Sequence, residues 1–218
     1  MGWFLTRRQE LTRCRGISTL NTAHGIDISH YNTNLQFHEL KESGISFVVV
    51  KATQSSQYVD PCFMDYYARV KKVGLLRSAY HFFNPDVDPI LQADFFCQTV
   101  PYEDGDLRLA LDVEVDGPNV SAHAAQCVER IKANTGYYPF LYSGVAFYAA
   151  NLSGITSCPL WLAEYAVGSP RVTQPPTIWQ YTDSGVWGGS GSPVDSNLFY
   201  GTVDELRTNH SMCCEASN

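Results

Sequence analysis

The sequence predicts an α/β fold, a barrel of about eight strands with intervening helices that becomes irregular on its C-terminal side. Two features of the sequence indicate this fold. Up to about residue 143, short apolar runs alternate with longer segments of helical spacing, as in a series of βα units. Beyond that point strand-like runs continue, but the segments between them are rich in Gly, Ser and Pro and are too short or broken for long helices.

The composition fits one soluble domain. The chain has 218 residues, of which 44% are hydrophobic, enough to bury a sizeable core. The formal net charge of −7 argues against a nucleic-acid partner, because phosphate binding requires a basic face. No stretch approaches the ~20 apolar residues that span a bilayer, so we expect no membrane partner. We expect a monomer.

The two ends of the chain differ from its middle. Residues 1–23 lack the ~7–15-residue apolar core of a secretory signal. Either export uses another route, or a signal was removed. We expect residues 1–23 to be a leader that is extended or peripheral, residues 24–201 to form the barrel domain, and residues 202–218 to form a C-terminal tail.

Eight strands are expected along the barrel. The second contains the run "ISFVVVKAT", which is continuous enough to be buried on both faces, as in a parallel sheet. The fourth ends in a cluster of acids, "RLALDVEVDG". The expected strands cover residues 25–29, 46–52, 75–82, 108–114, 138–143, 159–165, 177–182 and 195–200.

Three helices have clear sequence signals. Asp60 and Asp88 each precede a proline, which gives a cap followed by a proline in the first turn. The third helix ends at Gly136. We expect the buried faces to carry, in order, Phe63, Tyr66, Tyr67, Val70 and Val73; Ile90, Ala93, Phe96 and Cys97; and Val120, Ala124, Cys127, Val128 and Ile131. The seven cysteines are odd in number and match no metal-binding spacing, which favours free thiols.

Acidic residues lie where a parallel barrel would place an active site. Asp27 ends the first strand, Asp112 and Glu114 end the fourth, and Asp195 opens the last. Asp112 and Glu114 are two residues apart on a strand, so they share a face with Cα atoms ~6.7 Å apart. Like charges this close raise one pKa, and paired carboxylates with divergent pKa values are typical of glycoside hydrolysis. A strand-end Asp-x-Glu alone could also be a loop cap or a divalent-metal site.

Aromatic residues accompany these acids in or at the ends of the expected strands. Flat rings with polar tips suit stacking on sugar faces, although packing inside the barrel is an equal alternative for any single ring. His81 is expected to be a hydrogen-bonded core residue. The aromatic candidates are Tyr80, Phe82, Tyr142, Trp161, Tyr165, Trp179 and Tyr181.

Over residues 24–201 the sequence resembles glycoside hydrolase family 25, the Chalaropsis-type lysozymes or N-acetylmuramidases. The resemblance implies a modified TIM-like (β/α) barrel with about five helices. It also implies cleavage of the β-1,4 bond between N-acetylmuramic acid and N-acetylglucosamine in bacterial peptidoglycan, hence action on the cell wall, whether extracellular, periplasmic or delivered. Eight strings carry the resemblance in order: "HGIDISHYN", "GISFVVVKAT", "SAYHFF", "LALDVE", "TGYYPFLYS", "PLWLAEY", "IWQYT" and "VDSNLF".

The resemblance assigns roles to the acids. It implies that Glu114 is the general acid/base and that Asp112 is its partner, either as nucleophile or as the group that orients the substrate's 2-acetamido group. Asp27 and Asp195 match two further acids that line the cleft. The expected substrate-binding residues are Tyr80, Phe82, Tyr142, Trp161, Tyr165 and Gln180. We expect no cofactor and no metal, because proton transfer and carboxylate stabilisation suffice for this reaction.

Arg77 departs from the resemblance, since the family often has small residues there. It is expected either to face outward harmlessly or to alter the barrel rim. Two other functions remain open. A chitinase-like N-acetylglucosaminidase also uses strand-end acids, but its longer run of acids is absent from "RLALDVE". A non-catalytic glycan-binding barrel would be expected to lose one of the acids, and all four are present.

Overall fold

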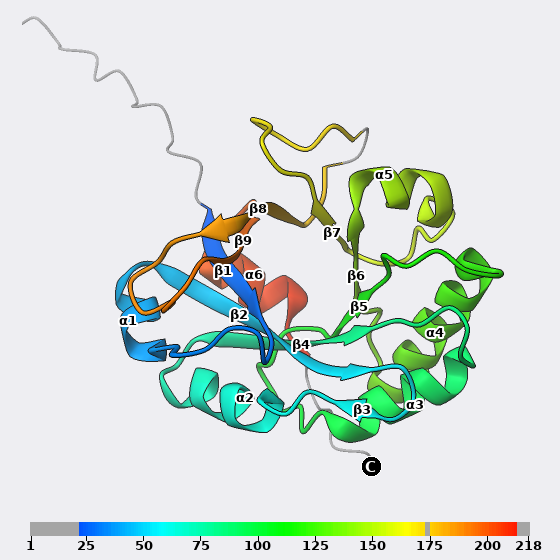
Figure 1. Cartoon of the computed structure of the whole chain (residues 1–218), viewed down its shortest axis with the longest axis horizontal. Coiled ribbons are helices and arrows are strands. Elements are labelled where there is room, and N and C mark those ends of the chain that lie inside the picture. Colours follow the sequence, from blue (N-terminus) through cyan, green and yellow to red (C-terminus); the bar gives the residue numbers. More distant parts are fainter. Residues whose placement is uncertain (1–21, 173–174, 213–218) are drawn as a thin grey trace, which may run out of the picture.

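The computed structural model describes residues 22–172 and 175–212, which form a closed barrel of eight strands (Figure 1). The order around the barrel is β1-β9-β8-β7-β6-β5-β4-β2, and β2 closes it by pairing with β1. The short β3, Tyr58–Val59, adds to β2 from outside the closed ring. The barrel strands are β1 Ala23–Ile28, β2 Ile45–Gln54, β4 Leu76–Phe82, β5 Ala110–Asp112, β6 Phe140–Gly144, β7 Leu160–Ala163, β8 Ile178–Gly185 and β9 Val194–Phe199.

All eight expected strands and the fold class are confirmed, with one difference in direction. β9 runs antiparallel to both neighbours, β1 and β8, whereas the other barrel pairings are parallel. Residues 186–193 connect β8 to β9. They are too few for the crossover of a dozen or more residues that a parallel pair requires, so β9 reverses direction.

Helices cover the first half of the barrel more completely than the second. Figure 1 shows α2, α3 and α4 grouped along one side of the strands, whereas the described residues between β7 and β9 form no helix. This agrees with the expected irregular C-terminal side. The helices are α1 Phe37–Glu42, α2 Phe63–Lys72, α3 Pro89–Thr99, α4 Val120–Thr135, α5 Val145–Phe147 and α6 Val203–His210, with a π-helical turn η1 at Tyr148–Leu152.

The buried helix faces match the expectation except for Val73, which follows α2 and is only partly buried, and for two residues of α3. Asp88 caps α3 by accepting hydrogen bonds from the backbone N–H groups of Ile90 and Leu91, and Ala93 and Phe96 are buried. Ile90, however, is 38% exposed, and Cys97 is only partly buried. Ile90 faces a shallow apolar groove against α4 instead of the core, so the inward placement predicted for it is wrong.

Residues alternate between the inside and the outside of the barrel along each strand. On β4, Leu76 and Tyr80 belong to the interior cluster, whereas Ala79 packs in the outer cluster between barrel and helices. On β1, Gly25 is required inside the barrel, because a Cβ at this position would lie 2.3 Å from the ring of Phe47. Inward side chains fill the middle of the barrel, and those at the carboxyl ends of the parallel strands line a pocket.

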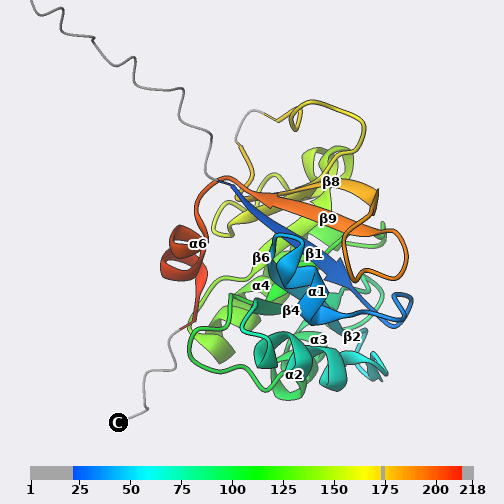
Figure 2. The same cartoon turned by 90° about the vertical axis from the view of Figure 1, so that its left-hand side faces the viewer.

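The other end of the barrel is closed by α6. Leu206 is fully buried in the interior cluster, and the ring of His210 packs against Phe140 and Phe199. Thr202 and Glu205 form a capping box that starts the helix. Figure 2 shows α6, in red, on one side of the strands and away from α2 and α3. The segment expected as a tail thus contributes a helix to the barrel.

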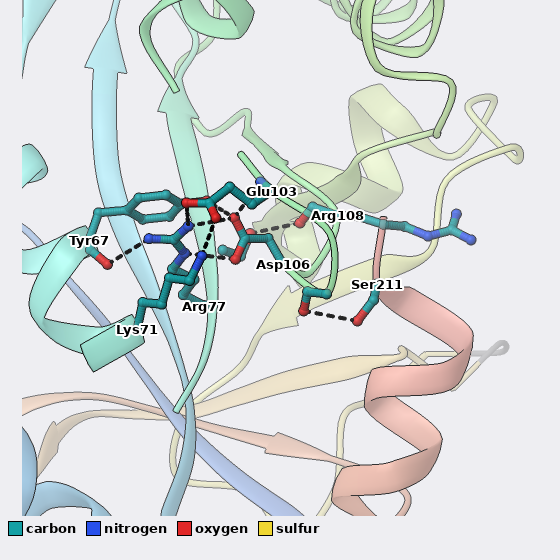
Figure 3. Close-up of polar contacts among 9 residues, drawn as sticks. Tyr67, Lys71, Arg77, Glu103, Asp106, Arg108 and Ser211 are labelled. Atoms are coloured by element: carbon teal, nitrogen blue, oxygen red, sulfur yellow. Dashed lines mark hydrogen bonds and ion pairs between the residues drawn. The ribbon is translucent and has the colours of Figure 1, made fainter. Parts of the chain in front are cut away.

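Arg77 is a buried anchor near the start of β4 (Figure 3). It is 4% exposed, faces outward beneath α2, and donates from Nε and Nη2 to the two carboxylate oxygens of Asp106 at 2.7 and 2.9 Å. Its guanidinium lies 3.9 Å from the ring centroid of Tyr67, whose hydroxyl also donates to Asp106. Arg77 faces outward, as one of the two expectations stated, but it is buried, and this network ties β4 to α2 and the turn at 103–106.

Other expectations concern the chain ends and the cysteines. Residues 1–21 of the leader and residues 213–218 of the tail lie outside the described residues, as do Cys14, Cys213 and Cys214. Within the described residues, the thiols of Cys62, Cys97, Cys127 and Cys158 are free. In the same part of the chain, no helix is long and apolar enough to cross a membrane.

Candidate active site

A polar pocket opens at the end of the barrel opposite α6, where the parallel strands terminate. Eight of the expected site residues line it: Asp27, Asp112, Glu114, Asp195, Tyr80, Phe82, Tyr142 and Trp161. Tyr165 lies beside Glu114 in an adjoining hollow, and Gln180 is buried behind Asp27. The barrel thus brings together all ten residues, and their individual roles remain predictions.

The reversed direction of β9 explains how Asp195 reaches this pocket. Asp195 is near the start of β9, and its register partner is Asp27, near the end of β1. On a parallel strand the first residues would lie at the opposite end of the barrel. The antiparallel pairing therefore places the acid that opens the last strand beside the acid that ends the first.

Asp112 and Glu114 point into the same pocket from the end of β5, as their spacing predicts. Asp112 is 6% exposed, and Glu114 lies exposed at the mouth. Burial raises the pKa of Asp112 well above its ordinary value, the negative charges of Glu114 and Asp27 add to the rise, and Lys51 opposes it. Burial, followed by the charge of Asp27, also raises the pKa of Glu114. Burial is thus a larger cause than the mutual repulsion of the pair.

One carboxyl oxygen of Asp112 lacks a hydrogen-bond donor in the described part of the chain. Asp112 Oδ1 is buried and has no hydrogen-bond partner among the described residues. A buried acceptor without a donor is costly, and such groups tend to have a functional explanation. Because Asp112 lines the pocket, this oxygen is available to a bound molecule.

Asp27 is held by two amide side chains. Its Oδ2 accepts hydrogen bonds from Gln180 Nε2 at 2.9 Å and from Asn197 Nδ2 at 2.7 Å. The indole N–H of Trp161 donates to Asn197 Oδ1 at 2.7 Å. Since an indole N–H can only donate, it fixes the Asn197 amide with its NH₂ group toward Asp27.

The Gln180 amide is fixed in the same way. Its Oε1 accepts hydrogen bonds from the hydroxyls of Tyr142 and Tyr165, at 2.8 and 2.5 Å. Both amides therefore present donors to Asp27. This explains why Gln180 and Tyr165 belong to the site although neither lines the main pocket: they orient a residue that does.

The pKa values of Asp27 and Asp195 are both raised, and their causes favour a proton on Asp195. Burial raises the pKa of Asp195 to about 8, and the charge of Asp27 and a hydrogen bond donated to Asp27 contribute to the rise. The pKa of Asp27 is also raised by burial, but its hydrogen bonds from Asn197, Gln180 and Asp195 act against this. With two amide donors fixed on Asp27, the acceptor of the pair is Asp27.

Three pocket residues were not predicted: Ser29, Tyr31 and Lys51. Ser29 and Tyr31 follow β1 in the loop "SHYN". Lys51 Nζ donates to Gln54 Oε1 at 2.9 Å and lies 4.7 Å from the ring centroid of Phe82. A signal for Lys51 was present, because it is a single cation within the continuous apolar run "FVVVKAT", where an uncompensated charge would be costly.

His81 lies outside the pocket, as expected for a core residue. It is fully buried, its Nδ1 is 2.7 Å from Thr53 Oγ1, and its Nε2 is 3.3 Å from Gln92 Oε1. Burial lowers the pKa of His81 to about 4. Among the described residues, no group of three or more His, Cys, Asp or Glu side chains is placed to hold a metal ion. Hydrolysis without a metal remains a prediction.

Comparisons with known proteins agree with this geometry. The family model of glycosyl hydrolases family 25 matches residues 26–190. The Chalaropsis N,O-diacetylmuramidase is 30% identical over 85% of this chain and 98% of its own, and the uncharacterized Escherichia coli protein YegX is 36% identical over 85% and 72%.

Among solved structures, the lysozyme from Streptomyces coelicolor superposes with a TM-score of 0.80 at 27% identity, over 86% of this chain and 97% of that one. The family match includes Asp27, Asp112 and Glu114, whereas Asp195 lies beyond its end. The chain therefore belongs to glycosyl hydrolases family 25, and it is a glycoside hydrolase.

Proposed function

We propose that this glycoside hydrolase is a muramidase that cleaves the β-1,4 bond between N-acetylmuramic acid and N-acetylglucosamine in peptidoglycan, using Glu114 and Asp112. The names of its relatives, lysozyme and N,O-diacetylmuramidase, support the substrate. The observation that carries the catalytic assignment is the arrangement on β5: one exposed and one buried carboxyl group enter the same pocket from adjacent inward positions.

Glu114 is assigned as the general acid. It lies at the mouth of the pocket, where a glycosidic oxygen can approach it, and its raised pKa favours the protonated form that this role requires. In the first step its proton passes to the leaving oxygen as the bond to the anomeric carbon breaks. In the second step the resulting carboxylate takes a proton from the attacking water.

Asp112 is assigned as the partner that opposes positive charge. Its unpartnered Oδ1 can either attack the anomeric carbon or accept a hydrogen bond from the N–H of the substrate's 2-acetamido group. In the second case the acetamide oxygen attacks the anomeric carbon and Asp112 stabilises the cation that forms. Both roles use Asp112 as a carboxylate. Burial and the charges of Glu114 and Asp27 raise its pKa and oppose that form, and the nearby ammonium group of Lys51 acts in the other direction.

The remaining site residues are assigned to substrate positioning. Asp27 and Asp195 form one wall, with the proton of Asp195 directed at Asp27. The same pocket contains aromatic rings on which a sugar can pack, those of Tyr80, Phe82, Tyr142 and Trp161. We infer that the enzyme acts on the cell wall, which the names of its relatives support, and that it has no nucleic-acid partner, which the net charge of −7 supports. We also expect a monomer without a membrane partner.

Purified peptidoglycan incubated with the wild-type protein and with Glu114→Gln tests the proposal. The substitution keeps the shape and hydrogen-bonding reach of the side chain but removes the transferable proton, so the rate should fall by about 10²–10⁴-fold. Glu39→Gln, an exposed position on α1, is the matched control and should retain full activity. Retained activity in Glu114→Gln would remove Glu114 from the role of acid.

A further inference from the structure

The loop after β1 holds an aromatic ring out into solvent at the mouth of the pocket. Tyr31 is 81% exposed, yet it lines the same pocket as Asp27 and Glu114. A large ring exposed to this extent gains little from burial within the protein itself. Because it lies at the mouth of the pocket, a bound substrate can cover this ring.

The ring of Tyr31 rests on a second ring that is anchored in the core. The ring centroids of His30 and Tyr31 are 4.0 Å apart, and those of His30 and Tyr58 on β3 are 6.4 Å apart in an edge-to-face arrangement. His30 Nδ1 is 2.6 Å from Asp60 Oδ2, and the side chain of Asp60 is fully buried. Since Asp60 Oδ1 accepts the backbone N–H of Cys62, the support of Tyr31 reaches the start of α2.

Hydrogen bonds also fix the backbone on both sides of Tyr31. The N–H of Ser29 donates to Asn32 Oδ1 at 2.9 Å, and the N–H of Asn32 donates to the carbonyl of Ser29. The hydroxyl of Tyr66 donates to the carbonyl of Asn32 at 2.6 Å. The backbone that carries the exposed ring is thus held by hydrogen bonds, and the ring itself packs on His30. A ring restrained in this way loses less conformational entropy when a ligand packs on it.

We propose that Tyr31, supported by His30 and Tyr58, is a stacking platform for a sugar ring of the glycan strand outside the cleaved disaccharide. The proposal rests on the proposed function, since the occupant is the next part of the same polymer. The continuity of Tyr31 with the pocket identifies that occupant, because a strand that leaves the pocket along this wall must pass over the ring. Tyr58, 41% exposed on β3, extends the same wall. His30 is a positioning residue that acts through Tyr31.

The dependence of kcat/KM on substrate length tests the platform. Alternating N-acetylglucosamine and N-acetylmuramic acid oligomers of increasing length should show a step in kcat/KM at the length that reaches Tyr31. In Tyr31→Ala that step should disappear through a roughly tenfold rise in KM for the longer oligomers, because the ring's stacking and burial energy is lost. Tyr31→Phe should keep the step, and His30→Ala should reduce it.

Tyr200→Ala is the matched control, because Tyr200 is 43% exposed but follows β9 at the opposite end of the barrel. This variant should behave as wild type at every length. A length profile in Tyr31→Ala that equals the wild-type profile would overturn the proposal, and so would an equal loss of kcat at all lengths.

Binding separates the platform from the proposed function. In the Glu114→Gln background, calorimetric titration with the long oligomer should give a Kd roughly tenfold weaker when Tyr31→Ala is added. If binding depends on Tyr31 in this way but the wild-type protein cuts no oligomer, the platform is supported and the muramidase assignment is rejected. Binding that does not depend on Tyr31 would reject the platform whatever the activity.

Discussion

Asp195 lies directly opposite Asp27 in the pairing of β9 with β1, and the hydrogen bond between their carboxyl groups raises the pKa of Asp195 and lowers that of Asp27. The antiparallel direction of β9 creates this contact. The amides of Gln180 and Asn197 both donate to Asp27, so the proton of the pair resides on Asp195. The site thus holds, beside Asp112 and Glu114, a second pair of acids in which Asp195 is the group with the higher affinity for a proton.

The stability of the protein should depend on the proton of Asp195. Its pKa is about 8 in the folded protein against an ordinary value of 3.8, so the folded state binds the proton more tightly than the unfolded state does. This contribution to the free energy of unfolding is complete below about pH 4 and is lost as the pH rises to about 8. Asp195→Asn retains a hydrogen-bond donor but cannot titrate, so the decline of stability over this window should be shallower.

Urea unfolding at a series of pH values measures that slope. Asp204→Asn, an exposed position on α6, serves as the control and should reproduce the wild-type slope. An unchanged slope in Asp195→Asn would show that Asp195 is not protonated in the folded protein.

The hydrogen bond from Trp161 to Asn197 should matter to Asp27 through the orientation of the amide. Trp161→Phe leaves Asn197 Oδ1 buried without this donor, which should cost about 1–3 kcal/mol of stability. It also allows the Asn197 amide to turn its oxygen toward Asp27, which disfavours the carboxylate. The acidic limb of the kcat/KM profile should then move to higher pH.

Trp187→Phe gives a matched comparison, because Trp187 Nε1 also donates to a residue of β9, Ser196, whereas the amide donors to Asp27 are Gln180 and Asn197. It should leave the pH profile in place. A profile that moves equally in both variants would mean that the shift has no connection with Asn197.

Arg77 should be among the most sensitive positions for stability. Arg77→Met would leave Asp106 buried without its bidentate partner, and breaking a buried ion pair in this way costs about 3–5 kcal/mol. Arg207→Met removes an exposed pair on α6 and should cost at most about 0.5 kcal/mol. Urea unfolding compares the two, and similar losses would contradict the anchoring role of Arg77.

The sequence predicts the strands well because their signal is local. Each barrel strand is an apolar run bounded by turn residues, and the alternation of inward and outward positions along a strand is enough to place Asp112 and Glu114 on one face. The four acids could likewise be placed together, because the ends of neighbouring strands meet.

What the sequence did not predict depends on contacts distant along the chain. The direction of β9 depends on the length of its connection, and the expected strand bounds left 183–194 between β8 and β9, a length compatible with either direction. Arg77 could not be recognised as buried, because its partner Asp106 lies on a separate turn. The helix α6 did have a signal, the capping box from Thr202 to Glu205, but its role in closing the barrel is evident only when Leu206 meets the interior.

A substrate with hydroxyl in place of the 2-acetamido group decides the role of Asp112. Substrate-assisted attack requires the acetamide oxygen, so under that mechanism the analogue should bind but remain uncut. If Asp112 is the nucleophile, the analogue should be cleaved and a glycosyl ester on Asp112 should be trapped. Asp112→Asn should abolish turnover of the natural substrate in either case, because the developing positive charge loses its carboxylate.

The sugar at the new reducing end of digested peptidoglycan distinguishes a muramidase from other glycoside hydrolases most directly. Purified peptidoglycan is digested with the wild-type protein, the new ends are reduced with borohydride, and the labelled sugar is identified by mass spectrometry. N-acetylmuramic acid should occupy the subsite on the non-reducing side of the cleaved bond, so the reduced sugar should be N-acetylmuramitol. Reduced N-acetylglucosamine at the new ends would contradict the account and make the enzyme a glucosaminidase.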